Sequence, residues 1–87
     1  MTKSSPEQRT RFASLLEEVV ADKVAADIAL RTAELWTDIP WNEPEINNAW
    51  HALSHFEIDQ DIRTKDLKYD EGLRRQLLGH IAKLRST

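Results

Sequence analysis

The sequence predicts an all-α domain, a small antiparallel bundle of three or four helices with a long N-terminal helix. Two observations support this prediction. Apolar residues recur at intervals of three and four positions in every long segment, and no segment alternates in polarity over the length of a strand. The 87 residues include only two glycines and three prolines, so few positions interrupt a helix. This length suits a single domain over residues 1–87, with flexible ends at about 1–5 and 86–87.

The first helix is expected to begin at Pro6. Ser5 can cap it, and Pro6 suits the first helical position because its missing N–H would have no partner there. Gln8 completes the spacing of a capping box, in which two side chains and two backbone N–H groups pair reciprocally. The sequence therefore predicts a firm N-terminal boundary for this helix.

An apolar seam continues from this start and predicts a long helix. No glycine or proline occurs between Glu7 and Ile39, so one helix of roughly 30 residues is expected. The alternative is a break near Ala21 to Lys23, where the seam is interrupted. A seam of this length predicts self-association as a homodimer, with Leu30 in the contact. The members of the seam are Phe12, Leu16, Val19, Ala26, Leu30 and Ala33.

The connection to the second helix covers residues 37–44. It contains two prolines, each of which disfavours a helical conformation in the residue before it, and Asn42 is the predicted cap of the second helix. This helix is expected from about Glu43 to about Ile58. One of its faces is apolar and should meet the first helix; it consists of Ile46, Ala49, Trp50, Leu53 and Phe56.

A last helix is predicted from Asp66, as its cap, to about Leu84. The preceding segment, residues 59–65, is too polar to assign to a helix or a strand. The apolar face of the last helix should complete the core, and it consists of Tyr69, Leu73, Leu77, Ile81 and Leu84.

The charges are distributed unevenly along the chain, although the formal net charge is only −3. Residues 34–61 contain seven Asp or Glu residues and no Lys or Arg, whereas residues 62–87 contain seven basic residues against three acidic ones. We expect these two regions to attract each other. The acidic region also predicts a basic partner, because complementary potentials steer association.

The three tryptophans, Trp36, Trp41 and Trp50, fall within or next to the acidic region. Tryptophan is enriched among the residues that dominate binding energy at protein interfaces. Trp36 and Trp50 are expected to pack in the core, and Trp41, between two prolines, is expected to be exposed. Trp41 with Glu43 and Glu45 is therefore predicted to form a docking edge. The leading interpretation is a noncatalytic protein-interaction module.

Two other functions are compatible with particular residues. His51 and His55 lie four positions apart on the second helix and could share a metal ion, with Asp59 one turn further along. A nucleic-acid-associated protein is the other alternative, because the basic residues gather in the C-terminal helix. The net negative charge argues against it, since binding to nucleic acid depends on neutralising phosphates.

Several classes of function lack the residues that they require. There are no cysteines, which excludes disulfides, thiolate metal sites and cysteine nucleophiles. The serines lack a nucleophile-elbow setting, and Gly72 and Gly79 fall inside the last helix rather than before a helix start, where a phosphate loop needs them. We expect no enzymatic activity and no cofactor. The polar N-terminus and the lack of any apolar stretch near 20 residues predict a cytoplasmic protein without a membrane span.

Overall fold

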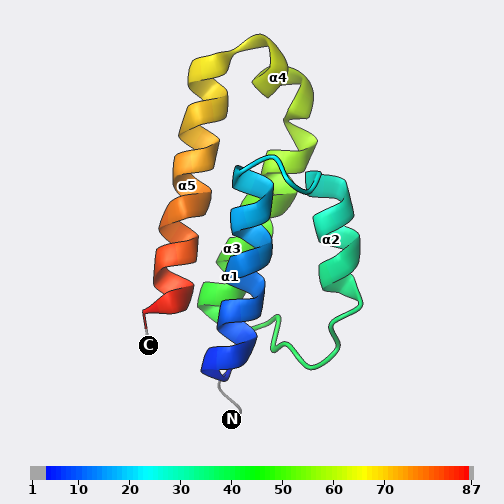
Figure 1. Cartoon of the computed structure of the whole chain (residues 1–87), viewed down its shortest axis with the longest axis vertical. Coiled ribbons are helices and arrows are strands. Elements are labelled where there is room, and N and C mark those ends of the chain that lie inside the picture. The colour runs from blue at the N-terminus through cyan, green and yellow to red at the C-terminus, as the bar shows by residue number, and fades with distance from the viewer. Residues whose placement is uncertain (1–3, 87) are drawn as a thin grey trace.

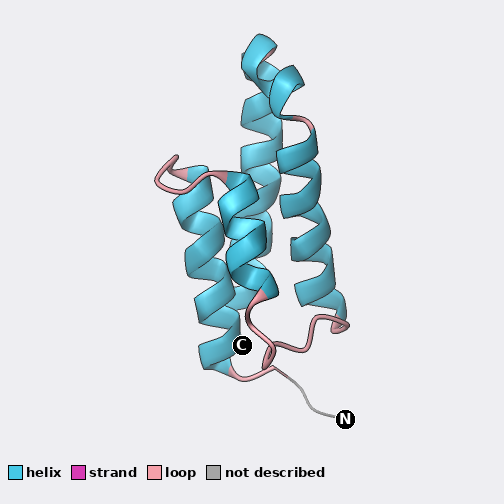
Figure 2. Ribbon diagram, turned by 90° about the vertical axis from the view of Figure 1, so that its right-hand side faces the viewer, coloured by secondary structure: helices cyan, strands magenta, loops and turns pink. Residues whose placement is uncertain are grey.

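The computed structural model describes residues 4–86, which are all-helical, with five helices packed together and no strand (Figure 1). The helices are α1 (Pro6–Val20), α2 (Ala26–Glu34), α3 (Pro44–Ile58), α4 (Gln60–Lys65) and α5 (Leu67–Arg85). α1 and α3 run in one direction and α2 and α5 in the other, with α4 at the turn between α3 and α5 (Figures 1 and 2). The predicted number of three or four helices is too low, because the first predicted helix is divided and the unassigned polar segment forms α4. None of the described helices combines the length and hydrophobicity needed to cross a membrane.

The predicted start of α1 is confirmed. The Ser5 hydroxyl accepts a hydrogen bond from the Gln8 N–H at 3.2 Å, and the Gln8 side-chain oxygen accepts one from the Ser5 N–H at 2.9 Å. The Ser4 N–H also donates to the Glu43 carboxylate at 2.9 Å, so both serines are tied to the folded chain. Of the ends that were expected to be flexible, residues 1–3 and 87 lie outside the described residues.

The prediction of a long continuous first helix is wrong, and the alternative of a break near Ala21 to Lys23 is confirmed. The helix ends in a Schellman motif, in which the Lys23 N–H donates to the Glu18 carbonyl at 2.8 Å and the Asp22 N–H donates to the Val19 carbonyl at 3.1 Å. Asp22 has a φ of 61°, in the left-handed region where glycine is the usual residue. The motif here uses aspartate, so the glycine signal that marks most such ends is missing from the sequence.

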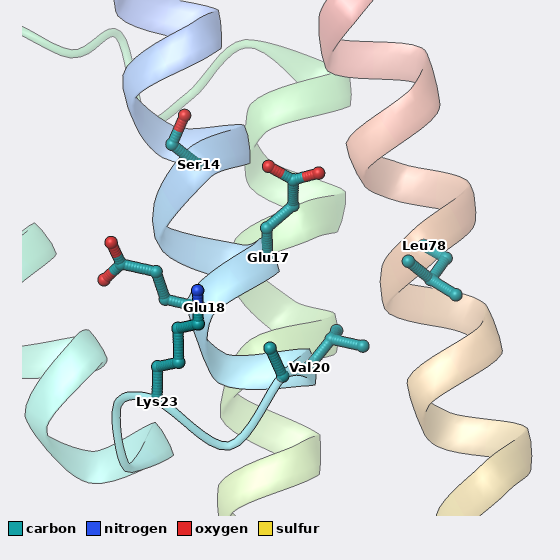
Figure 3. Close-up of a pocket in the computed structure, with 7 residues that line it drawn as sticks. Ser14, Glu17, Glu18, Val20, Lys23 and Leu78 are labelled. Carbon is teal, nitrogen blue, oxygen red and sulfur yellow. The ribbon is translucent and has the colours of Figure 1, made fainter.

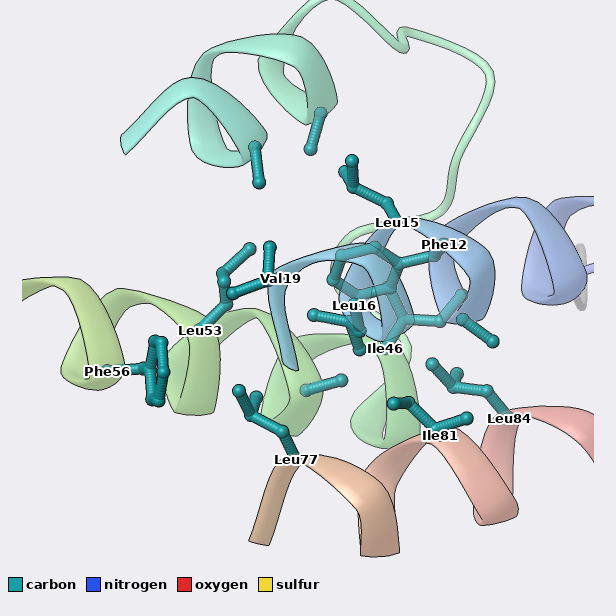
Figure 4. Packing of buried hydrophobic residues seen from close by; sticks show 14 of the residues in the cluster. Phe12, Leu15, Leu16, Val19, Ile46, Leu53, Phe56, Leu77, Ile81 and Leu84 are labelled. Carbon is teal, nitrogen blue, oxygen red and sulfur yellow. The ribbon is translucent and has the colours of Figure 1, made fainter. Parts of the chain in front are cut away.

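The apolar faces predicted from the sequence meet in one core (Figure 4). Buried side chains of α1, α3 and α5 meet in this core, and Ala29 and Ala33 of α2 belong to the same cluster. The seam of the first predicted helix is thus covered within one chain, and Leu30 is itself partly buried against this core. Burial of this apolar seam therefore does not require a dimer. The largest fully buried side chains are Phe12, Leu16, Val19, Ile46, Leu53, Leu77 and Leu84.

The starts of α3 and α5 differ in how they are capped. Glu43, not Asn42, is the cap residue of α3, and no side chain accepts a hydrogen bond there, so the prediction of Asn42 is wrong. Pro44 occupies the first turn, where a missing N–H leaves no donor to satisfy. Asp66 caps α5 as predicted, and its carboxylate accepts hydrogen bonds from the Lys68 and Tyr69 N–H groups at 3.1 and 3.2 Å.

Arg9 joins three helices at one end of the molecule. It is 7% exposed, and its guanidinium donates to the carbonyls of Leu84 and Lys83, both at 3.0 Å. These carbonyls belong to the last turn of α5, where no helical N–H is left to pair with them. The same guanidinium pairs with Glu43 at 3.5 Å and with Glu45 at the start of α3. Arg9 therefore satisfies the end of one helix and the beginning of another.

Arg63 and Arg74 likewise bind the end of one helix and the beginning of another, at the opposite end of the molecule. Arg63 of α4 donates to the Phe56 carbonyl in the last turn of α3 at 2.8 Å, and Arg74 of α5 donates to the Val20 carbonyl that ends α1. Both arginines also pair with Asp70, at 2.9 and 2.7 Å. In α1, α3 and α5, the C-terminal turn is thus capped by an arginine from another segment.

Candidate functional site

A groove that combines aromatic and acidic side chains lies where α2, the connection after it and α3 meet. Its volume is about 370 Å³, and its lining residues are Glu34, Trp41, Asn47, Trp50 and His51. Glu34 is the last residue of α2, and Trp41 lies in the connection. Asn47, Trp50 and His51 are three and four residues apart, which places them on one face of α3. Pockets bounded by different elements in this way are common binding sites.

Two aromatic residues of the groove, Trp41 and Trp50, belong to a row of three rings that begins at the buried Phe12. The ring centroids of Phe12 and Trp41 are 5.2 Å apart at an interplanar angle of 86°, and those of Trp41 and Trp50 are 5.2 Å apart at 58°. The Trp41 indole N–H donates to the Trp36 carbonyl at 3.1 Å, and the Asn47 amide donates to the Trp41 carbonyl at 3.3 Å. Trp41 is therefore fixed and partly buried, contrary to the expectation that it is exposed. Trp50 ends the row beside the groove.

The acidic wall is formed by Glu34, which sequence analysis did not single out. Its side chain is exposed and makes no ion pair or hydrogen bond with any residue of 4–86. A carboxylate in the last turn of a helix lies near the negative end of the helix dipole, which is electrostatically unfavourable. Arg31 lies one turn earlier on α2 and does not pair with it. The groove thus has an uncompensated negative charge.

The two glutamates of the predicted docking edge lie with Arg9 and do not line this groove. The side chain of Glu43 is 21% exposed and that of Glu45 is 50% exposed. Both therefore have an intramolecular role at the start of α3. In the described chain, the acidic region forms its salt bridges with α1 and with His55, and none with the basic region, so the expected attraction between the two regions is not realised as ion pairs.

Next to the groove, the ring of Trp36 already has a cationic neighbour, the guanidinium of Arg11. The guanidinium carbon of Arg11 lies 5.2 Å from the centroid of the Trp36 ring. The two terminal nitrogens of the same guanidinium donate to the two carboxylate oxygens of Asp38 at 3.0 and 2.9 Å. This bidentate pair raises the pKa of Arg11 and lowers the pKa of Asp38. One arginine side chain thus contacts an aromatic ring and a carboxylate together.

The two histidines of the predicted metal site have different surroundings. His51 lines the groove, whereas His55 contacts the Asp59 carboxylate at 2.8 Å. The Tyr69 hydroxyl donates to the same carboxylate, and this hydrogen bond raises the pKa of Tyr69. Within residues 4–86, no group of three or more His, Cys, Asp or Glu side chains is arranged to hold a metal ion.

The basic residues of the C-terminal region are partly used inside the molecule. Arg63 and Arg74 pair with Asp70, and Arg85 pairs with Glu17 of α1 at 2.5 Å. The Arg63 pair joins α4 to α5 and the Arg85 pair joins α5 to α1, whereas the Arg74 pair lies within α5. The remaining basic residues of α4 and α5 are exposed and form no salt bridge in the described chain; they are Lys65, Lys68, Arg75 and Lys83.

A cavity of larger volume, about 520 Å³, lies elsewhere, between α1 and α5. Figure 3 shows Glu17 extending between these helices and Leu78 on α5 facing it. Its lining contains no aromatic residue, and the carboxylate of Glu17 is already paired with Arg85. The smaller groove beside Trp50 therefore offers the richer set of binding groups.

Comparisons of the chain with protein families, with curated proteins and with solved structures find no match.

Proposed function

We propose that this chain is a noncatalytic protein-interaction module that docks a basic segment of another protein in the groove beside Trp50. The observation that carries the proposal is the carboxylate of Glu34, without an ion pair in residues 4–86, on the same groove as the end of an aromatic row. A carboxylate and the face of an indole ring both attract a cation. A Lys or Arg side chain therefore suits both walls of the groove.

The charge of the region 34–61 supports a basic partner. Of the seven acidic residues in the region 34–61, Glu34, Glu57 and Asp61 form no salt bridge in the described chain. No basic residue lies in that region to offset them. The resulting negative potential accelerates the encounter with a cationic segment and weakens as salt is added.

Self-association and nucleic-acid binding have less support. The apolar seam that motivated a dimer is covered within one chain. Of the seven basic residues in the region 62–87, three are held in intramolecular salt bridges. Docking of a basic segment uses the carboxylate of Glu34, which is unpaired within residues 4–86, together with the tryptophans that line the same groove.

An NMR titration tests this proposal. The ¹⁵N-labelled protein is titrated with a blocked peptide that carries four basic residues spaced by glycine and serine, and separately with its acidic counterpart. We expect the basic peptide to shift the indole signals of Trp50 and Trp41 and the backbone amide of Glu34. Binding should weaken as salt is raised, because the contact is largely electrostatic.

Two variants give the control. Glu34→Gln removes the charge without removing an intramolecular contact, and we expect the dissociation constant to rise about threefold to tenfold. Glu71→Gln makes the same change on α5, which lies on the opposite side of α1 and α3 from α2 (Figure 1), and it should leave binding unchanged. Equal effects of the two variants, or equal binding of the acidic peptide, would contradict the proposal.

A further inference from the structure

We infer that the groove beside Trp50 selects an arginine side chain over a lysine side chain. The inference rests on the proposed function and names the group that the basic segment supplies. It is carried by the lining of the groove, which includes both Trp50 and Glu34, so a cation bound there has an indole ring and a carboxylate as neighbours.

The aromatic row decides where a cation can lie. The rings of Trp41 and Trp50 touch, with centroids 5.2 Å apart, so a cation cannot enter between them. Trp41 has a second ring neighbour in Phe12, whereas Trp50 ends the row. Trp50 therefore has one ring neighbour fewer than Trp41, and it lines the groove, so it is the ring more open to a cation.

A planar guanidinium can satisfy both walls together. It stacks on an aromatic ring while its N–H donors point outward in its plane and reach a carboxylate with two parallel hydrogen bonds. A lysine ammonium is a compact and strongly hydrated charge, which must give up more of its hydration to contact both groups. The combination of ring and carboxylate therefore favours arginine.

Within residues 4–86, three arginines contact both an aromatic ring and a carboxylate. One of them, Arg74, lies 5.5 Å from the centroid of Phe56 and pairs with Asp70 at 2.7 Å. Arg11 lies over Trp36 and pairs with both oxygens of Asp38. Arg63 lies 3.5 Å from the centroid of Phe56 and pairs with Asp70 at 2.9 Å. No lysine within residues 4–86 forms a salt bridge or lies over a ring.

The end of α2 provides an independent argument. The C-terminal turns of α1, α3 and α5 each accept hydrogen bonds from an arginine of another segment, namely Arg74, Arg63 and Arg9. No arginine of the described chain donates to the last turn of α2, which ends at Glu34. A cation bound at the groove would lie at the negative end of this helix dipole. An arginine from the partner would thus supply to α2 what the chain's own arginines supply to α1, α3 and α5.

Three blocked peptides test the inference: Gly-Ser-Xaa-Ser-Gly with arginine, lysine or citrulline at Xaa. Citrulline keeps the planar shape of arginine and lacks the charge. The readout is the shift of the Trp50 indole signal of the ¹⁵N-labelled protein at increasing peptide concentration. We expect the arginine peptide to bind at least about threefold more tightly than the lysine peptide, and the citrulline peptide to be the weakest. Glu34→Gln should remove the difference between arginine and lysine, whereas Glu71→Gln should preserve it.

The outcomes separate the inference from the function on which it rests. Equal binding of the arginine and lysine peptides, with both shifting Trp50, would overturn the inference and leave the proposed function standing. Absence of any shift with either peptide would overturn both. A shift of Trp50 that depends on protein concentration without peptide would show that a second copy fills the groove, which also contradicts the inference.

Discussion

Arg9 shows how one charged residue can belong to an apolar face. It lies three positions before Phe12 and seven before Leu16, so it continues the spacing of the seam toward the N-terminus. Periodicity marks the position as buried, but the charge suggests an exposed one. The groups that bind the guanidinium are distant from Arg9 in sequence; they are the carbonyls of Lys83 and Leu84 and two glutamates. This contact therefore could not be predicted from local pattern.

We predict that Arg9→Ala lowers the free energy of unfolding by about 3 kcal/mol, because it removes the guanidinium that donates to the buried carbonyl of Leu84 and pairs with Glu43 and Glu45. Denaturant unfolding followed by circular dichroism measures the change. Arg85→Ala is the matched control, since it breaks an exposed pair between α5 and α1, and it should shift the midpoint only slightly. Equal midpoint shifts would contradict the structural role assigned to Arg9.

We predict that Trp41→Ala also destabilises the protein, by about 3 kcal/mol, because the ring packs against Phe12 and Trp50. The melting temperature should fall by several degrees. Trp50→Ala should destabilise less, since Trp50 ends the row, and it should remove peptide binding. If Trp41→Ala left the melting temperature unchanged while abolishing binding, Trp41 would be an exposed anchor and the row would be misassigned.

At the scale of elements, the helices were easier to predict than their ends. The faces of α1, α3 and α5 follow from three- and four-residue spacing, and burial confirms them. The ends depend on single residues. Ser5 and Asp66 carry the expected cap chemistry and were predicted correctly, whereas the end of α1 uses Asp22 where glycine is usual. The polar segment that forms α4 has no apolar face to reveal it.

The left-handed conformation of Asp22 gives a prediction. Both Asp22→Ala and Asp22→Gly lose the ion pair with Arg74, at 2.8 Å, but only glycine adopts a φ of 61° without strain. The glycine variant should therefore be more stable than the alanine variant by about 1 kcal/mol. Chemical denaturation of the two variants measures the difference. A more stable alanine variant would mean that the turn after α1 is not the one described.

Asp70 links α4 to α5 and predicts a pH dependence. Burial raises its pKa, but hydrogen bonds from Arg74 and Arg63 outweigh burial and hold the pKa below its ordinary value of 3.8. The folded state therefore binds this proton less readily than the unfolded state. The resulting stabilisation is fully present above the unfolded pKa and is lost as the pH falls below it. Asp70→Asn should flatten the dependence of stability on pH in this acidic range, measured by denaturant unfolding at successive pH values. Identical profiles of the two proteins would contradict the assignment.

For the molecule as a whole, the fold class and the core residues could be predicted, but the candidate site could only be located by region. Clustered charge and tryptophans pointed to the segment around Trp41. The pairing of Glu43 and Glu45 with Arg9, and the meeting of Glu34 with Trp50, depend on how α2 folds back on α3. The break near Ala21 to Lys23, which the sequence offered as the alternative to a continuous helix, turns α2 back so that Glu34 lies at the groove.

The most direct test of the central claim is a measurement of intermolecular NOEs between the Gly-Ser-Arg-Ser-Gly peptide and the protein. Binding in the groove predicts NOEs from the arginine side-chain protons to the ring protons of Trp50, reduced in Glu34→Gln and retained in Glu71→Gln. NOEs confined to other residues, such as Leu78 in the larger cavity between α1 and α5, would contradict the claim.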